Sequence, residues 1–113
     1  MKITVNQTTS LLEQLFQFAS RARIVMTGRE LIKRKKSDLQ FIWITEDFSE
    51  NSKMEIMDEF KHYPIVQCFT SVLIEKCLDL RGTKLVAFKK SDLSRSIYRE
   101  LKPWRINGNT KTI

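Results

Sequence analysis

The chain has 113 residues, of which 42% are hydrophobic and 29% are charged, and its formal net charge is +7. These values are typical of one globular domain, and no apolar run approaches the roughly 20 residues that a membrane-spanning helix needs. The excess of positive charge favours a polyanionic partner.

The first predicted element is an amphipathic helix. Ser10 and Glu13 form a capping box, and apolar residues follow them at helical spacing, so we expect a helix over residues 10–22. The segment RIVM, residues 23–26, then allows a short strand.

A short basic helix is expected next, and it leads into a buried strand. Thr27 and Glu30 form a second capping box around Gly28, which predicts a helix over about 28–36. The segment LQFIWI, residues 39–44, is apolar except for its glutamine, as expected for a strand that is covered on both faces.

The middle of the chain predicts a helix and a strand. Ser49 is placed to cap a helix over about 50–62, and apolar residues mark one stripe of that helix. Pro64 ends it, and the segment IVQCF, residues 65–69, reads as the next strand.

The last third predicts helix, strand and helix again. Ser71 begins a helix, and the segment KLVAF, residues 84–88, forms a strand after a turn. Ser91 caps a final helix that Pro103 ends. The remaining residues, 102–113, lack periodicity, so we expect a flexible C-terminal tail.

Strands that alternate with helices indicate an α/β fold, a three-layer α/β/α sandwich with helices on both faces of the sheet. We expect one domain over residues 1–101. Ligands of such sheets usually bind at loops beyond strand ends or at helix N-termini. The loop at 81–83 and the start of the 28–36 helix are therefore the candidate sites.

The charges are divided unevenly along the chain. Residues 21–36 carry seven basic residues and one acidic residue, residues 37–63 carry two and seven, and residues 64–113 carry ten and four. An acidic middle between two basic flanks suggests one basic face, provided that the fold brings the flanks together.

Several segments resemble the L-seven-Ae-type ribosomal proteins, which bind kink-turn RNA, and small bacterial YlxQ-like members are the most similar. The family shows an Ala-x-x-Ala segment, a helix-opening glycine with Glu-Leu soon after, an acidic pair before Ser-x-Asn, and a late loop before the last strand. Here these places are held by Ala19–Ala22, Gly28–Leu31, Glu46–Asn51 and Asp79–Lys84. The resemblance covers about residues 11–101.

The resemblance implies about five helices around a mixed sheet of about four strands. It also implies that RNA is bound by the helix that Gly28 opens, together with the loop before the last strand. Kink-turn readers of the family carry Asn-Glu where this chain has Glu30 and Leu31. Glu30 cannot donate as Asn does and Leu31 cannot hydrogen-bond, so contact with the RNA backbone is the firmer expectation.

The chemistry of these residues suits a sugar-phosphate backbone. The start of the helix offers free N–H groups, and Gly28 lets a backbone approach closely. Arg29, Lys33 and Lys36 share one stripe that can meet phosphates, and Arg34 is offset by about 100° from Lys33. The expected RNA-binding residues are Gly28, Arg29, Glu30, Lys33, Arg34, Lys36, Leu80, Arg81, Gly82 and Lys84.

Each of these features has a structural alternative. Gly28 can be an ordinary turn glycine, Glu30 a capping residue, and the basic stripe a solvated helix face. Leu80, expected as an apolar wedge against an unstacked base, can belong to the core. Trp104, which could stack on a base, can be a loosely packed aromatic.

The acidic pair Glu46 and Asp47 is expected to consist of turn and capping groups rather than catalytic acids. Cys68 and Cys77 stand among apolar residues and form no Cys-x-x-Cys pair, so we expect reduced core thiols, with a disulfide or redox pair as the alternative. The segment MKITVNQTTS has no apolar signal-peptide stretch, and the single histidine has no second ligand beside it. We therefore expect a cytoplasmic protein without a metal ion or cofactor.

The expected function is non-catalytic binding of a structured RNA, with ribosomal RNA and a kink-turn as candidates. A protein-interaction module on the same fold, with the acidic helix at 50–62 as its contact face, is the alternative. The sequence shows no nucleophile–base pair, and TGRELIKRKK lacks the glycines of a phosphate-binding loop, so we expect no enzyme activity and no small-molecule substrate. The oligomeric state is left open.

Overall fold

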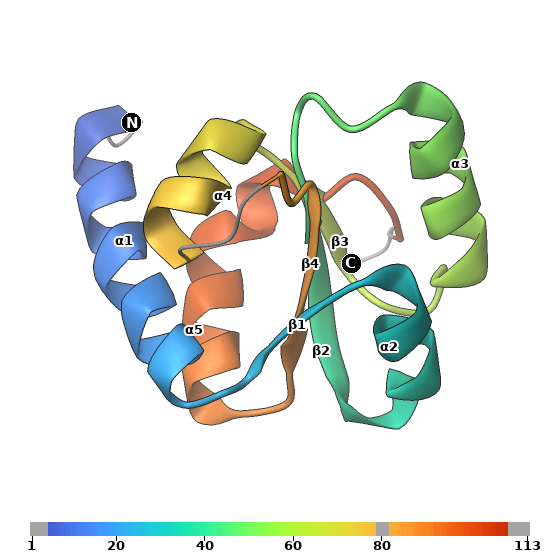
Figure 1. Cartoon of the computed structure of the whole chain (residues 1–113), viewed down its shortest axis with the longest axis horizontal. Helices are drawn as coiled ribbons and strands as arrows, with labels where there is room; N and C mark the ends of the chain where they lie inside the picture. Colours follow the sequence, from blue (N-terminus) through green and yellow to red (C-terminus); the bar gives the residue numbers. More distant parts are fainter. Residues whose placement is uncertain (1–4, 79–81, 109–113) are drawn as a thin grey trace.

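A four-stranded mixed sheet separates two layers of helices in the computed structural model, which describes residues 5–78 and 82–108 (Figure 1). The strands lie in the order β1-β4-β2-β3, with β2 and β3 parallel and the other neighbours antiparallel. The strands are β1 (Val25–Thr27), β2 (Leu39–Ile44), β3 (Ile65–Gln67) and β4 (Leu85–Lys89).

Three helices cover one face of the sheet and two cover the other (Figure 1). The first layer consists of α1 (Val5–Arg21), α4 (Ser71–Leu78) and α5 (Asp92–Leu101), and the second of α2 (Arg29–Arg34) and α3 (Glu50–Glu59). Two 3-10 turns, Lys36–Asp38 and Lys102–Trp104, follow α2 and α5. The expected three-layer α/β/α sandwich is confirmed.

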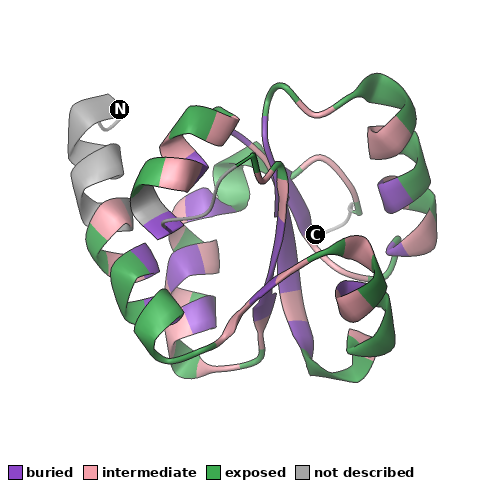
Figure 2. Cartoon of the chain, in the orientation of Figure 1, coloured by how far each residue is buried: buried purple, intermediate pink, exposed green. Residues whose placement is uncertain are grey.

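The central strand β2 shows why the sheet is covered on both faces. All of its residues except Gln40 are buried, and its side chains divide between two hydrophobic clusters. Trp43 packs into the cluster beneath α1, α4 and α5, where its ring lies 4.7 Å from that of Phe16 and its indole N–H donates to the Cys68 carbonyl at 2.8 Å. Ile42 packs into the cluster beneath α2 and α3. Figure 2 shows these buried residues on the sheet and on the helix sides that face it.

Two of the predicted helix caps are confirmed, and two are wrong. Ser10 does not cap the first helix, because α1 begins at Val5 and Ser10 lies within it. The Ser49 and Ser91 hydroxyls accept from backbone N–H groups at 3.1 and 2.9 Å at the starts of α3 and α5. The predicted box of Thr27 and Glu30 does not form: Gly28 is the N-cap of α2, with φ of 88° and no side-chain cap hydrogen bond. The chain passes from β1 into α2 through a backbone conformation that favours glycine.

Other boundaries differ in smaller ways. Helix α1 begins at Val5, before the predicted start at residue 10, and α2 ends at Arg34, where the chain tightens into a 3-10 turn. The strand expected near residues 23–26 is present as β1, shifted by one or two residues along the chain.

The predicted flexible tail is wrong for residues 102–108. Arg105 forms an antiparallel bridge with Val66, and the Ile106 N–H donates to the Ile65 carbonyl at 2.9 Å. The Asn107 side chain accepts from the Ile65 N–H at 2.9 Å and donates to the Tyr63 carbonyl at 2.8 Å. Strand β3 lies at the edge of the sheet, and this segment satisfies its outer backbone groups. The domain therefore extends beyond residue 101, and residues 109–113 lie outside the described part.

The cysteine prediction is confirmed for Cys68, which is free and 1% exposed. Burial, and next the Glu46 carboxylate, raise the pKa of its thiol to about 12. The side chain of Cys77 lies outside the described part of the structure.

Candidate nucleic-acid interface

The start of α2 and the loop before β4 lie at the same end of the sheet. Thr27, the last residue of β1, pairs with Val86 near the beginning of β4. Gly28 therefore lies beside the residues that precede β4, among them Lys84. No atom outside the neighbouring residues lies within 4 Å of the point where a Gly28 Cβ would stand, so a ligand backbone can approach this surface.

The basic stripe of α2 has protein partners on α3. The Arg29 guanidinium lies 2.9 Å from the Glu55 carboxylate and 3.5 Å from that of Glu59, and the Lys33 ammonium lies 3.0 Å from Glu59. Lys36 donates to the Glu59 carbonyl at 3.2 Å and lies 5.0 Å from the centre of the Phe60 ring. The hydrogen bond that Arg29 donates to Glu55 raises the pKa of Arg29, and the hydrogen bond from Lys33 lowers the pKa of Glu59.

These contacts reduce the positive charge that this stripe can present to an RNA. Arg29 and Lys33 pair with carboxylates of α3, so much of their charge is balanced within the molecule, whereas Lys36 contacts a backbone carbonyl and an aromatic ring. Contact of these three residues with RNA stays a prediction. Arg34, by contrast, is exposed and makes no ion pair with any described residue, and the same holds for Glu30.

Leu31 and Ile32 anchor α2 to the sheet. Ile32 is 0% exposed, and half-buried Leu31 packs against the same cluster. Leu31 therefore helps to hold α2 on the sheet, and contact of this turn with an RNA backbone stays a prediction.

The loop before β4 is only partly described. The predicted contacts of Leu80 and Arg81 lie outside the described residues. The Gly82 N–H, at a residue with φ of 63°, donates to the Glu75 carboxylate at 2.7 Å, and the Lys84 ammonium lies 3.8 Å from Asp47. The described surroundings of this loop are therefore rich in carboxylates, a feature that the charge partition along the chain did not reveal.

Asp47 fixes the beginning of α4. Its carboxylate accepts from the Ser71 N–H at 3.1 Å and from the Ser71 hydroxyl at 2.8 Å. The nearby Thr45 side chain, and next the hydrogen bonds from Ser71, lower the pKa of Asp47 to about 2. Asp47 thus has the capping role that was expected of the acidic pair.

Sequence reasoning missed a second concentration of positive charge, at the opposite end of the strands. It comprises Arg23 before β1, Lys35 after α2, Lys89 and Lys90 at the end of β4, and Arg95 on α5. The Lys-Lys pair at the end of a buried strand was the sequence signal for this basic surface, because residues at the end of a strand lie at the exposed end of the sheet.

Other kinds of site have little support in the described residues. These residues contain no group of three or more His, Cys, Asp or Glu side chains that could hold a metal ion. None of the described helices has the length and apolar character needed to cross a membrane.

Comparisons with known proteins identify the fold. No family model matches the sequence, and no curated protein matches it either. Among solved structures, a protein of unknown function from Bacillus halodurans is similar with a TM-score of 0.73 and 16% identity, over 80% of this chain and 96% of that chain. A 15.5 kD RNA-binding protein from Giardia lamblia is similar with a TM-score of 0.65 and 13% identity, over 90% of each chain. At these identities the likeness concerns the fold.

Proposed function

We propose that this protein is a non-catalytic RNA-binding protein of the L-seven-Ae type. The observation that carries the proposal is the fold shared over 90% of both chains with an RNA-binding protein. The net charge of +7 is consistent with it, because a protein that neutralises phosphates gains affinity from released counterions.

The proposed site is the first turn of α2 together with the loop before β4. Gly28 leaves room for a sugar-phosphate backbone, Lys84 supplies a cation beside it that also lies 3.8 Å from Asp47, and Arg34 supplies exposed charge from the last turn of α2. Leu80 and Arg81 would contribute from the loop. Since Glu30 cannot donate and Leu31 faces the core, the site is suited to an RNA of a given shape more than to a base sequence.

The role of Asp47 at the start of α4 supports the proposal that the protein is non-catalytic. Asp47 has the most strongly lowered carboxylate pKa, and both of its oxygens bind Ser71 at the start of α4. A carboxylate that stays ionised and already accepts two hydrogen bonds is a poor general acid or base near neutral pH.

The acidic helix α3 is less available to a protein partner than its sequence suggests. Glu55 and Glu59 already pair with Arg29 and Lys33 of α2. The protein-interaction alternative therefore loses two of its contact residues, and the RNA-binding function is preferred.

The test compares two charge-neutralising double variants on two RNAs. The RNAs are a hairpin that contains a kink-turn and a plain duplex of equal length, with binding followed by fluorescence anisotropy. Arg34→Ala/Lys84→Ala should weaken binding of the kink-turn hairpin on the order of tenfold. Lys61→Ala/Lys76→Ala removes the same charge at exposed positions outside the site and is the matched control.

Equal affinity of the wild type and Arg34→Ala/Lys84→Ala would place the RNA elsewhere on the molecule. Wild-type affinity that does not change between roughly 50 and 200 mM salt would rule out phosphate binding altogether.

A further inference from the structure

Three connections, α1–β1, α2–β2 and β4–α5, bring five cations to one end of the strands. The Lys89 N–H donates to the Ile24 carbonyl at 2.7 Å, and the Lys90 N–H donates to the Asp38 carbonyl at 2.7 Å. These bonds hold the α1–β1 turn, the 3-10 turn after α2 and the β4–α5 turn together. We call the resulting set the basic rim; its members are Arg23, Lys35, Lys89, Lys90 and Arg95.

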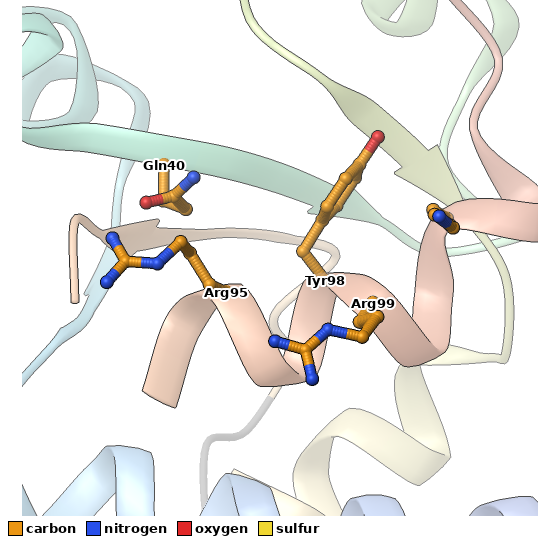
Figure 3. A pocket seen from close by; sticks show the side chains of 5 residues that line it. Gln40, Arg95, Tyr98 and Arg99 are labelled. Carbon is orange, nitrogen blue, oxygen red and sulfur yellow. The ribbon is translucent and has the colours of Figure 1, made fainter. Parts of the chain in front are cut away.

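A hollow of about 270 Å³ continues the rim along α5. Its lining consists of Gln40, Arg95, Tyr98, Arg99 and Lys102. Figure 3 shows Gln40 of β2 beside Arg95, with Tyr98 and Arg99 further along the helix. Gln40 reaches this place because the register of β2 on β4 shifts between Leu39 and Phe41.

The hollow presents charge that the protein leaves largely unbalanced. Arg95, Arg99 and Lys102 recur at i, i+4 and i+7, which places them in a row of about 10 Å on one helix face. Arg95 pairs with Asp92, whereas Arg99 and Lys102 make no ion pair with any described residue. Glu100, also on α5, does not line the hollow.

The hollow suits a backbone rather than a base. The Tyr98 ring centre lies 5.3 Å from that of Phe41, and its hydroxyl accepts from Arg105 at 3.2 Å, so the ring is already used by the protein. What remains available is two guanidinium groups, one ammonium group and one amide. Arginine forks and lysines bind phosphate oxygens, and an amide donates to a phosphate or a ribose hydroxyl.

Arg23, one of the rim residues, has a left-handed backbone conformation. It follows α1 with φ of 58°, and the bonds Arg23 N–H to Ser20 and Ile24 N–H to Ala19, at 3.1 and 3.2 Å, close the helix around it. Glycine is the usual residue in this left-handed position. An exposed arginine therefore occupies a backbone conformation that is unfavourable for a residue with a Cβ atom.

We infer that the basic rim and the α5 hollow form a second RNA-binding surface, which takes the phosphodiester backbone of a structured RNA. The inference rests on the proposed RNA-binding function and adds to it a surface distinct from the first turn of α2. Gly28 and Lys84 lie at the other end of the strands from the rim, about 17 Å away along β2, and α2 with Arg34 connects the two ends, so one RNA can contact both.

The experiment uses the full chain and a plain RNA duplex of about 24 base pairs, with anisotropy measured between roughly 50 and 200 mM salt. Arg95→Ala/Arg99→Ala should weaken binding on the order of tenfold and reduce the slope of log K against log salt by about 1.8, because two phosphate contacts are lost. Lys61→Ala/Lys76→Ala, with the same loss of charge, should leave the slope near that of the wild type.

Arg95→Gln/Arg99→Gln serves as a second variant that keeps long side chains on the helix, and circular dichroism checks that both variants fold. Wild-type binding by these variants, together with weakened binding by Arg34→Ala/Lys84→Ala, would overturn the second surface and leave the proposed function intact. A loss equal to that of Lys61→Ala/Lys76→Ala would also overturn it, since total charge would then explain the effect. Absence of RNA binding by the wild type would overturn both proposals.

Discussion

The two ends of the sheet differ in how many of their cations are paired with carboxylates of the same protein. At the end where β4 begins, Lys84 pairs with Asp47, and the neighbouring cations of α2 pair with α3. At the end where β4 finishes, Lys89, Lys90 and Arg99 make no ion pair with any described residue. The comparison teaches that a basic run in a sequence gives the number of charges but not how many remain available to a partner.

The substitution Arg23→Gly separates an effect on the stability of the protein from an effect on RNA binding at the basic rim. Relief of the left-handed conformation, less the entropy that glycine adds to the unfolded chain, should raise the free energy of unfolding by about 0.5–1 kcal/mol. Loss of one phosphate contact should lower affinity for duplex RNA about threefold. Urea unfolding and anisotropy measure the two effects, and a more stable protein with unchanged RNA affinity would remove Arg23 from the surface.

The substitution Glu59→Gln tests whether Arg29 and Lys33 bind RNA more tightly once their partner on α3 is removed. Glu59→Gln removes the carboxylate shared by Arg29 and Lys33, so the free energy of unfolding should fall by about 0.5 kcal/mol, as is usual for exposed pairs. The freed charge should raise RNA affinity about twofold. Asp58→Asn, an exposed acid on the same helix, is the control. A decrease in affinity would mean that Glu59 positions these cations for RNA rather than occupying them.

The smallest expected effect concerns pH at the acidic end. The pKa of Asp47 is about 2 in the folded protein, against an ordinary value of 3.8 for the unfolded chain. The contribution of this carboxylate to stability is therefore present above about pH 4 and is lost as the pH falls towards 2. Asp47→Asn should therefore show a smaller decrease in urea midpoint between neutral and acidic pH than the wild type. An identical pH dependence in both proteins would show that the hydrogen bonds to Ser71 do not hold this carboxylate ionised.

Local patterns predicted the fold well. The boundaries of β2 were correct because an apolar run ends at polar residues on both sides, and Ser49 and Ser91 cap helices through bonds that span three residues. The box of Thr27 and Glu30 failed because the strand–helix junction sets the backbone of Gly28, and a local motif cannot overrule that geometry.

The site was predicted less well because its decisive contacts are distant in sequence. Helical spacing correctly grouped Arg29, Lys33 and Lys36, yet it could not show that residues 55 and 59 would meet them. Asn107 likewise binds residues more than 40 positions away, which no periodicity in the tail could reveal. The basic rim depends on three turns that only the sheet brings together.

Crosslinking of RNA to the protein in cells, followed by sequencing of the RNA and identification of the attached peptides, tests the central claim most directly. We predict that structured RNA is recovered, with attachment within residues 23–36 and 80–102. Recovery of no RNA above an untagged control, or of a protein partner that persists after nuclease treatment, would contradict the proposal that this protein binds RNA through these two surfaces.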